Sequence, residues 1–220
     1  SAEAYAVMDY DSGRILMSKN ENKEKLIAST TKIMTAIIAL EKGDLNSVRT
    51  EGSEVLKAYG SAIYIEMNEE ITLKDLLYGL MLRSGNDAAI EIAYHVAGDM
   101  ETFVEWMNQK AEELGMENTH FTNTVGLHDE EHYTTVEDVS ILLRYALQNR
   151  QFRTIFSSKS YQVPPTNYHL EGFTFLSSVF SQREDWTLEN GEIKGGKTGF
   201  TDEAGLCLAT SAFIGNAEYI

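Results

Sequence analysis

The sequence predicts an α+β fold, in which strands from both ends of the chain form one antiparallel sheet flanked by helices, with a helical lobe. Three observations lead to this prediction. Strand-like patterns lie at the start and in the last quarter of the 220 residues, helix-like apolar patterns fill the middle, and no stretch has the composition of a linker. We therefore expect a single domain over residues 1–220.

The expected strands begin with a hairpin. Residues 4–20, "AYAVMDYDSGRILMSKN", alternate around Asp11-Ser12-Gly13, which is a good hairpin turn. In the last quarter, the runs "SYQVPP", "GEIKGGKTGF" and "GLCLATSAFIG" also have strand-like patterns. The simplest packing joins the terminal strands in one sheet, with the helices on its faces.

The expected helices have recognisable ends. Thr72 and Asp75, and again Thr135 and Asp138, are spaced as capping boxes at helix starts. Glycines close three of the segments. The expected helical segments run from residue 26 to Gly43, and over 71–82, 87–98, 100–115 and 135–149.

The charge of the chain excludes some classes of partner. The sequence has 18 Lys and Arg residues against 34 Asp and Glu residues, a formal net charge of −16. This balance argues against binding to nucleic acid or to an anionic membrane surface, and no apolar run is long enough to span a membrane. Cys207 is the only cysteine, so an internal disulfide is impossible, and its apolar surroundings indicate a buried small hydrophobe.

A serine and a lysine stand three residues apart at the head of the apolar run 26–40, "LIASTTKIMTAIIAL". This spacing puts Ser29 and Lys32 on one side of a helix. If apolar neighbours desolvate Lys32, its pKa falls, and a neutral amine can take the proton of the serine hydroxyl. The alternative is an ordinary amphipathic lysine whose ammonium group reaches solvent.

Two further motifs have the residue types of a binding site. Ser84-Gly85-Asn86 lies in a sharp break between two expected helices, where a loop can present side chains into a cleft. Lys197-Thr198-Gly199 lies in a glycine-rich strand, whose small residues allow a substrate backbone to approach a sheet edge. The alternative for this second segment is an ordinary hairpin strand.

The three motifs occur in the order Ser-x-x-Lys, Ser-x-Asn and Lys-Thr-Gly, on helix, loop and strand. In these three motifs and their order, and over nearly its whole length, the chain resembles the low-molecular-mass penicillin-binding proteins. These are the serine D-Ala-D-Ala carboxypeptidases of the β-lactamase and transpeptidase superfamily. The resemblance implies a β-lactamase/transpeptidase-like fold, with no cofactor and no metal. It implies peptidoglycan stem peptides ending in D-Ala-D-Ala as substrate, acylation by β-lactam antibiotics, and an extracytoplasmic location in the bacterial cell envelope.

The resemblance also implies a role for each motif residue. Ser29 is the expected acylated nucleophile, Lys32 its base, and Ser84 the group that relays a proton to the leaving D-alanine. Asn86 is expected to hold the substrate backbone, while a cation and a hydroxyl donor suit the terminal carboxylate. The expected carboxylate-binding residues are Lys197, Thr198 and Gly199, and the expected oxyanion hole is formed by the N–H groups of Ser29 and Phe200.

The chain departs from the pattern of its apparent relatives in several places. Gly85 stands where class A β-lactamases have aspartate, and no Glu-x-x-Leu-Asn stretch is present, so a peptidase is favoured over a β-lactamase. Thr124 stands where the family often has proline. Relatives usually continue past "FIGNAEYI" with another strand and a helix, so we expect the domain to lack both, along with a signal peptide and a membrane anchor.

Three other functions remain open. His128 and His132 have i, i+4 spacing, with His120 as a possible third ligand, which would suit a zinc hydrolase. A solvated polar loop is the alternative explanation for these histidines. A sensor that β-lactams acylate but that turns over no peptide would share all three motifs. Transpeptidation would need only an amine in place of water at the acyl-enzyme.

Overall fold

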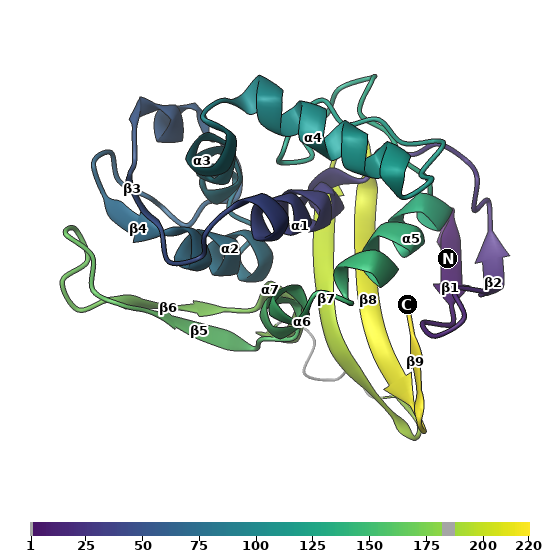
Figure 1. Ribbon diagram of the computed structural model, residues 1–220. Helices are drawn as coiled ribbons and strands as arrows, with labels where there is room; N and C mark the ends of the chain where they lie inside the picture. Colours follow the sequence, from purple (N-terminus) through teal and green to yellow (C-terminus); the bar gives the residue numbers. More distant parts are fainter. Residues whose placement is uncertain (1, 182–187) are drawn as a thin grey trace.

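The computed structural model describes residues 2–181 and 188–220 and has the predicted α+β architecture, with a sheet beside a group of helices (Figure 1). The first half of the described chain contains β1 (Tyr5–Met8), β2 (Ile15–Lys19), η1 (Ala28–Thr31), α1 (Lys32–Lys42), β3 (Val48–Thr50), η2 (Ser53–Lys57), β4 (Glu70–Thr72), α2 (Leu73–Leu82) and α3 (Asn86–Ala97). The second half contains α4 (Met100–Glu113), α5 (Val136–Ala146), α6 (Arg150–Phe156), β5 (Ser160–Val163), β6 (Phe173–Leu176), α7 (Ser178–Ser181), β7 (Gly191–Thr201), β8 (Gly205–Ile214) and β9 (Ala217–Tyr219).

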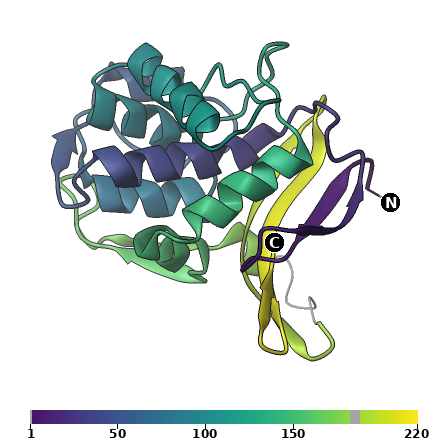
Figure 2. The ribbon, with the colours of Figure 1, turned by 45° about the vertical axis from the view of Figure 1, so that its right-hand side comes forward.

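The two ends of the chain meet in the sheet, as the sequence predicts. Strands β7, β8 and β9 form an antiparallel sheet in that order, and β1 and β2 form the expected hairpin. The hairpin joins β9 through backbone hydrogen bonds: Met8 and Ile220 exchange two at 2.9 Å, and the Tyr10 N–H donates to the Glu218 carbonyl at 3.0 Å. The two ends of the chain therefore lie on the same side of the molecule, beside the sheet (Figure 2).

The helices pack around α1, whose side chains from Ile33 to Ala39 are buried. The predicted capping boxes are confirmed, because the Thr72 hydroxyl accepts the Asp75 N–H, and Thr135 accepts that of Asp138, both at 3.1 Å. Gly98 ends α3 with φ +85°, a left-handed conformation that glycine adopts without a steric penalty. No helix in the described part of the chain is both long and apolar enough to cross a membrane.

The predicted strand at residues 160–165 does form, as β5, but it does not belong to the terminal sheet. It pairs with β6 in a separate hairpin beside α2, below the helices in Figure 1. Side-chain contacts explain this position: the Tyr161 ring stacks on that of Tyr78, with ring centroids 3.6 Å apart, and the Tyr161 hydroxyl donates to the Asp75 carboxylate at 2.7 Å. The expectation of a place in the sheet was therefore wrong.

Candidate active site

Ser29 and Lys32 lie together at the start of α1, although not on one continuous α-helix. Ser29 is in the 3-10 turn η1, and Lys32 is the first residue of α1. The Lys32 Nζ lies 2.9 Å from the Ser29 Oγ, 2.7 Å from the Asn86 Oδ1 and 2.9 Å from the Val125 carbonyl oxygen. A neutral amine fits these partners, since it can donate to the amide and carbonyl oxygens and accept the hydroxyl proton of Ser29.

The surroundings of Lys32 favour this neutral form. Its side chain is 0 % exposed, so the ammonium group does not reach solvent as the amphipathic interpretation requires. Burial holds the pKa of Lys32 well below its usual range, and the positive charge of Lys197 lowers this pKa further. Asp87 acts in the opposite direction, as a weaker influence.

Two glycines allow η1, the turn that contains Ser29, to lie close to its neighbours. A Cβ added to Gly126, which has φ +86°, would lie 1.8 Å from the Ala28 carbonyl oxygen. A Cβ on Gly199 of β7 would lie 2.8 Å from the Ser29 nitrogen. Ala28 itself has φ +46°, a strained value for a residue with a side chain. The chain around Ser29 is thus held in one arrangement by close backbone packing.

Lys197 connects β7 to the helices. Its Nζ donates to the Ser84 Oγ at 2.8 Å and to the Thr198 carbonyl at 2.7 Å. The Lys197 side chain is 1 % exposed, and burial lowers its pKa to about 7. Ser84 has φ +60°, in the break between α2 and α3 that the sequence predicts. The second and third motifs therefore meet directly.

Asn86 lies between Lys32 and the loop at residues 59–61. Its Oδ1 accepts from Lys32, and its Nδ2 donates to the Tyr59 carbonyl at 2.6 Å. The Asn86 N–H donates to the Ser61 carbonyl at 2.7 Å. One amide hydrogen of Nδ2 remains for a ligand, so the residue can bind substrate while positioning Lys32.

The remaining motif residues lie on the sheet beside Ser29. Thr198 is partly exposed, Gly199 is buried, and the Phe200 side chain is 61 % exposed. Strand β7 packs against η1, so the backbone of residues 199–200 runs next to the Ser29 nitrogen. This is the placement that an oxyanion hole made of the Ser29 and Phe200 N–H groups requires.

Supporting residues that the sequence analysis did not identify complete the site. Asn123 Oδ1 accepts three backbone N–H groups, from Val125 at 3.2 Å, Gly126 at 2.7 Å and Leu127 at 3.2 Å, and so forms the turn that presents the Val125 carbonyl to Lys32. The Asp87 carboxylate accepts the N–H groups of Ile63 and Ile65. An asparagine three residues before a glycine is a turn signal that could have identified the first of these.

The histidines that suggested zinc are used in other ways. Residues 128–132 form no helix, so the i, i+4 spacing does not align the two side chains. The Nε2 of His132 lies 2.8 Å from the Thr31 Oγ1, and its Nδ1 accepts the Thr122 N–H at 3.0 Å. His128 is exposed, and no group of three metal-ligating side chains occurs among residues 2–181 and 188–220. The donor set does not fit a zinc site.

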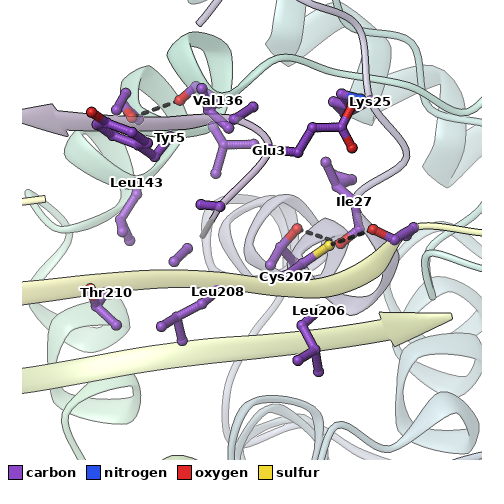
Figure 3. Close-up of a pocket in the computed structure, with 18 of the residues that line it drawn as sticks. Glu3, Tyr5, Lys25, Ile27, Val136, Leu143, Leu206, Cys207, Leu208 and Thr210 are labelled. Atoms are coloured by element: carbon purple, nitrogen blue, oxygen red, sulfur yellow. Dashed lines mark hydrogen bonds and ion pairs between the residues drawn. The ribbon is translucent and has the colours of Figure 1, made fainter. Parts of the chain in front are cut away.

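A separate cavity of about 400 Å³ lies between β1, α5 and β8, outside the Ser29 site (Figure 3). Ile27, Leu143, Leu206 and Leu208 contribute to its mainly apolar walls. Strand β8 pairs with β9 only over residues 212–214, so the rest of that edge faces this cavity. The Cys207 Sγ also lies there, and burial raises the pKa of its thiol, which argues against a nucleophilic role.

A sheet beside a helical lobe, with a serine next to a buried lysine at their junction, is typical of the penicillin-interacting serine enzymes. Residues 1–220 match the family model described as D-alanyl-D-alanine carboxypeptidase (Peptidase_S11). The chain belongs to this family of serine peptidases.

Individual relatives agree with the family assignment. The chain is 34 % identical to D-alanyl-D-alanine carboxypeptidase DacF of Bacillus subtilis over 228 residues, which cover 100 % of the chain and 56 % of DacF. It spans about half the length of the first curated relatives that it matches, with 54 % and 55 % of DacA from Haemophilus influenzae and Escherichia coli.

Solved structures are also similar. The crystal structure of a Mycobacterium tuberculosis D-alanyl-D-alanine carboxypeptidase has 31 % identity and a TM-score of 0.89, with 99 % of this chain and 80 % of that one covered. A mutant of the Streptomyces K15 DD-transpeptidase has 28 % identity and a TM-score of 0.88, with 100 % and 88 % covered.

Proposed function

We propose that the chain is the catalytic part of a serine D-Ala-D-Ala carboxypeptidase, which removes the terminal D-alanine from peptidoglycan stem peptides. The observation that carries this proposal is the distance of 2.9 Å between the Lys32 Nζ and the Ser29 Oγ, at a lysine with no exposed surface. A serine hydroxyl needs a base at this distance, and burial makes the lysine available as one. The proposed location is the bacterial cell envelope, outside the cytoplasm.

Acylation follows from this geometry. Neutral Lys32 takes the proton of Ser29, and the Ser29 Oγ attacks the carbonyl carbon of the penultimate D-alanine. The N–H groups of Ser29 and Phe200 stabilise the resulting oxyanion. The carbon–nitrogen bond then breaks, and Ser84 passes a proton to the leaving amine while Lys32 returns its own to Ser84.

Deacylation and substrate binding use the same groups. Water attacks the ester on Ser29 and releases the shortened peptide, with Lys32 again as the base. Lys197 and Thr198 bind the terminal carboxylate of the substrate, while Gly199 lets β7 lie close to η1 and so brings the peptide next to Ser29. A local cation thus allows a chain of net charge −16 to bind an anion. A β-lactam, as an acylating analogue of the peptide, occupies the same position.

The test is intact-mass analysis after incubation with penicillin, followed by peptide mapping of the adduct. We expect one penicilloyl group on Ser29 and none on Ser29→Ala. An adduct that persists on another residue would overturn the assignment. Release of D-alanine from a D-Ala-D-Ala peptide then separates the carboxypeptidase from an acylated sensor, which would take up penicillin but release no D-alanine.

A second candidate activity is transpeptidation. The similarity to the Streptomyces K15 DD-transpeptidase, at a TM-score of 0.88, favours it specifically. Both reactions share the acyl-enzyme and differ in whether water or an amine attacks it. The same assay, repeated with a D-amino acid or glycine as acceptor, gives the ratio of transfer to hydrolysis.

A further inference from the structure

His132 is a buried histidine that the proposed reaction does not use. Its side chain is 2 % exposed and meets the edge of the Phe121 ring, with ring centroids 5.6 Å apart. Burial lowers the pKa of His132 to about 4, so the imidazole is neutral near pH 7. A neutral imidazole has one donor nitrogen and one acceptor nitrogen, and both have partners here.

The two hydrogen bonds of His132 fix its tautomer. The Nδ1 accepts the Thr122 N–H at 3.0 Å, so this nitrogen carries no hydrogen. The Nε2 must then carry the hydrogen, and it donates to the Thr31 Oγ1 at 2.8 Å. His132 therefore links two segments that lie far apart in the sequence.

On one side, the bond reaches the turn that holds the nucleophile. Thr31 lies in η1, two residues after Ser29 and directly before Lys32, and is 0 % exposed. No side chain caps the start of η1 or of α1. The Thr31–His132 bond thus connects η1 to a side chain that belongs to neither η1 nor α1, and it holds this turn in place.

On the other side, the bond reaches the turn that positions the lysine. Thr122 precedes Asn123, whose side chain donates to the Thr122 Oγ1 at 3.2 Å and forms the turn over residues 123–127. That turn presents the Val125 carbonyl, which accepts from Lys32 at 2.9 Å. A shift of Thr122 would therefore move a partner of the catalytic base.

We propose that His132 is a positioning residue for acylation. Its two hydrogen bonds fix the position of η1, which contains Ser29, relative to the turn over residues 123–127, which binds Lys32. This role rests on the proposed function. It predicts that the hydrogen bonds of His132 affect the rate at which Ser29 attacks penicillin, and not the affinity for penicillin. The reason is that displacing a reacting group by about 1 Å can slow a reaction as much as a hundredfold.

The test compares variants that remove or keep one bond. Thr31→Val removes the hydroxyl that His132 reaches, whereas Thr31→Ser keeps it. His132→Asn keeps an acceptor near the position of Nδ1 but loses the donor to Thr31. We expect Thr31→Val and His132→Asn to lower the first-order rate constant of penicillin acylation by about tenfold or more, with an unchanged dissociation constant for the non-covalent complex.

Two controls separate positioning from general destabilisation. Ser47→Ala breaks another hydroxyl–histidine bond, Ser47 to His95 at 2.7 Å, which lies outside the proposed site. It should lower Tm without slowing acylation, while Thr31→Ser should acylate close to the wild-type rate. The double variant Thr31→Val/His132→Asn should acylate no more slowly than the slower single variant, since both changes remove the same bond.

Hydrogen exchange keeps this test independent of the proposed function. Amides of residues 28–32 should exchange faster in Thr31→Val than in Thr31→Ser or Ser47→Ala. If wild-type protein takes up no penicillin, the proposed function fails. The exchange result alone then decides whether the Thr31–His132 bond holds residues 28–32 in place. A folded Thr31→Val that acylates and exchanges like wild type would overturn the proposal.

Discussion

At the scale of single residues, Lys197 combines two properties that seldom occur together: it is buried, and it is assigned to bind an anion. Burial lowers its pKa to about 7, so the bare site holds a lysine that is only partly charged near neutral pH. A carboxylate beside it would favour the ammonium form. Binding of an anionic substrate should therefore be coupled to uptake of a proton by Lys197.

Replacing this lysine tests its assigned role. Lys197→Ala should lower kcat/KM for a peptide with a free terminal carboxylate by at least about a hundredfold, since a charge-assisted hydrogen bond in a buried site is lost. The same peptide with an esterified terminus should lose much less. Steady-state assays on both peptides give the two ratios, and equal losses would contradict carboxylate binding by Lys197.

Gly126 gives a second test at this scale. Gly126→Ala places a Cβ against the Ala28 carbonyl and should cost about 3 kcal/mol or more of unfolding free energy, as well as slowing acylation. Gly115→Ala is the matched control, because it also has a positive φ, +73°, with no atom within 4 Å of the added Cβ. Backbone strain alone should lower the unfolding free energy of Gly115→Ala by about 1 kcal/mol. Urea unfolding and penicillin acylation measure both effects.

At the scale of elements, the long helices could be predicted well from the sequence, whereas the seven-residue helix α6 and the short strands could not. Capping residues such as Thr72 and Thr135 act on the next few residues, so their pattern is visible locally. Strands β3 and β4 have three residues each, too few to show a period. The position of β5 beside α2 involves contacts with Tyr78, which is distant in the sequence, so its separation from the terminal sheet was not predicted.

Glu51, which directly follows β3, and Glu91 of α3 place two carboxyl groups in one buried space. Glu51 and Glu91 are 1 % and 0 % exposed, and both Glu51 oxygens lack a donor among the described residues. Arg49 donates to Glu91 at 3.2 Å, which leaves Glu51 as the uncharged member. Burial and the neighbouring Glu91 raise the pKa of Glu51 well above its usual range.

This pair predicts how stability changes with pH. The folded state holds the Glu51 proton more tightly than the unfolded state, so this stabilisation is complete below the unfolded pKa and is lost as pH rises toward the folded pKa. Glu51→Gln has a similar side chain that stays neutral at every pH. The unfolding free energy of the variant minus that of wild type should therefore be more positive at about pH 9 than at about pH 5. Urea unfolding at both values measures this, with the exposed Glu105→Gln as control. An effect that is independent of pH would contradict the assignment.

At the scale of the whole molecule, the candidate site exists only where the helices and the sheet meet. Ser29, Ser84 and Lys197 come from three distant parts of the chain, and the bond from Lys197 to Ser84 spans the junction. The sequence revealed these residues through their motifs, because each motif is local. The turn at Asn123 is local as well, but the contact of His132 with Thr31 joins residues 101 positions apart, so the sequence could not reveal it.

A second link across the molecule is the ion pair between Arg153 of α6 and Glu218 of β9, with 2.7 Å between Nη1 and Oε1. Glu218 is 6 % exposed and has one further partner, the Ser211 hydroxyl at 2.6 Å. Arg153→Met leaves this carboxylate buried without its cation and should lower the unfolding free energy by about 2 kcal/mol. The loss is smaller than for a fully buried ion pair because the guanidinium is partly exposed. The double variant Arg153→Met/Glu218→Gln should recover much of the loss in urea unfolding, and no recovery would contradict a penalty caused by the unpaired charge.

The pairing of Met8 with Ile220 has a consequence for how the protein is made. The ribosome delivers the first hairpin and η1 early, whereas residues 217–220 emerge only after everything between them. Until residues 217–220 emerge, the open edge of β1 has no neighbouring strand, and until β7 emerges, Ser84 has no Lys197 to bind. The growing chain therefore carries Ser29 through most of the synthesis of these 220 residues before β7 and β9 exist, and the proposed site can assemble only after both strands have been made.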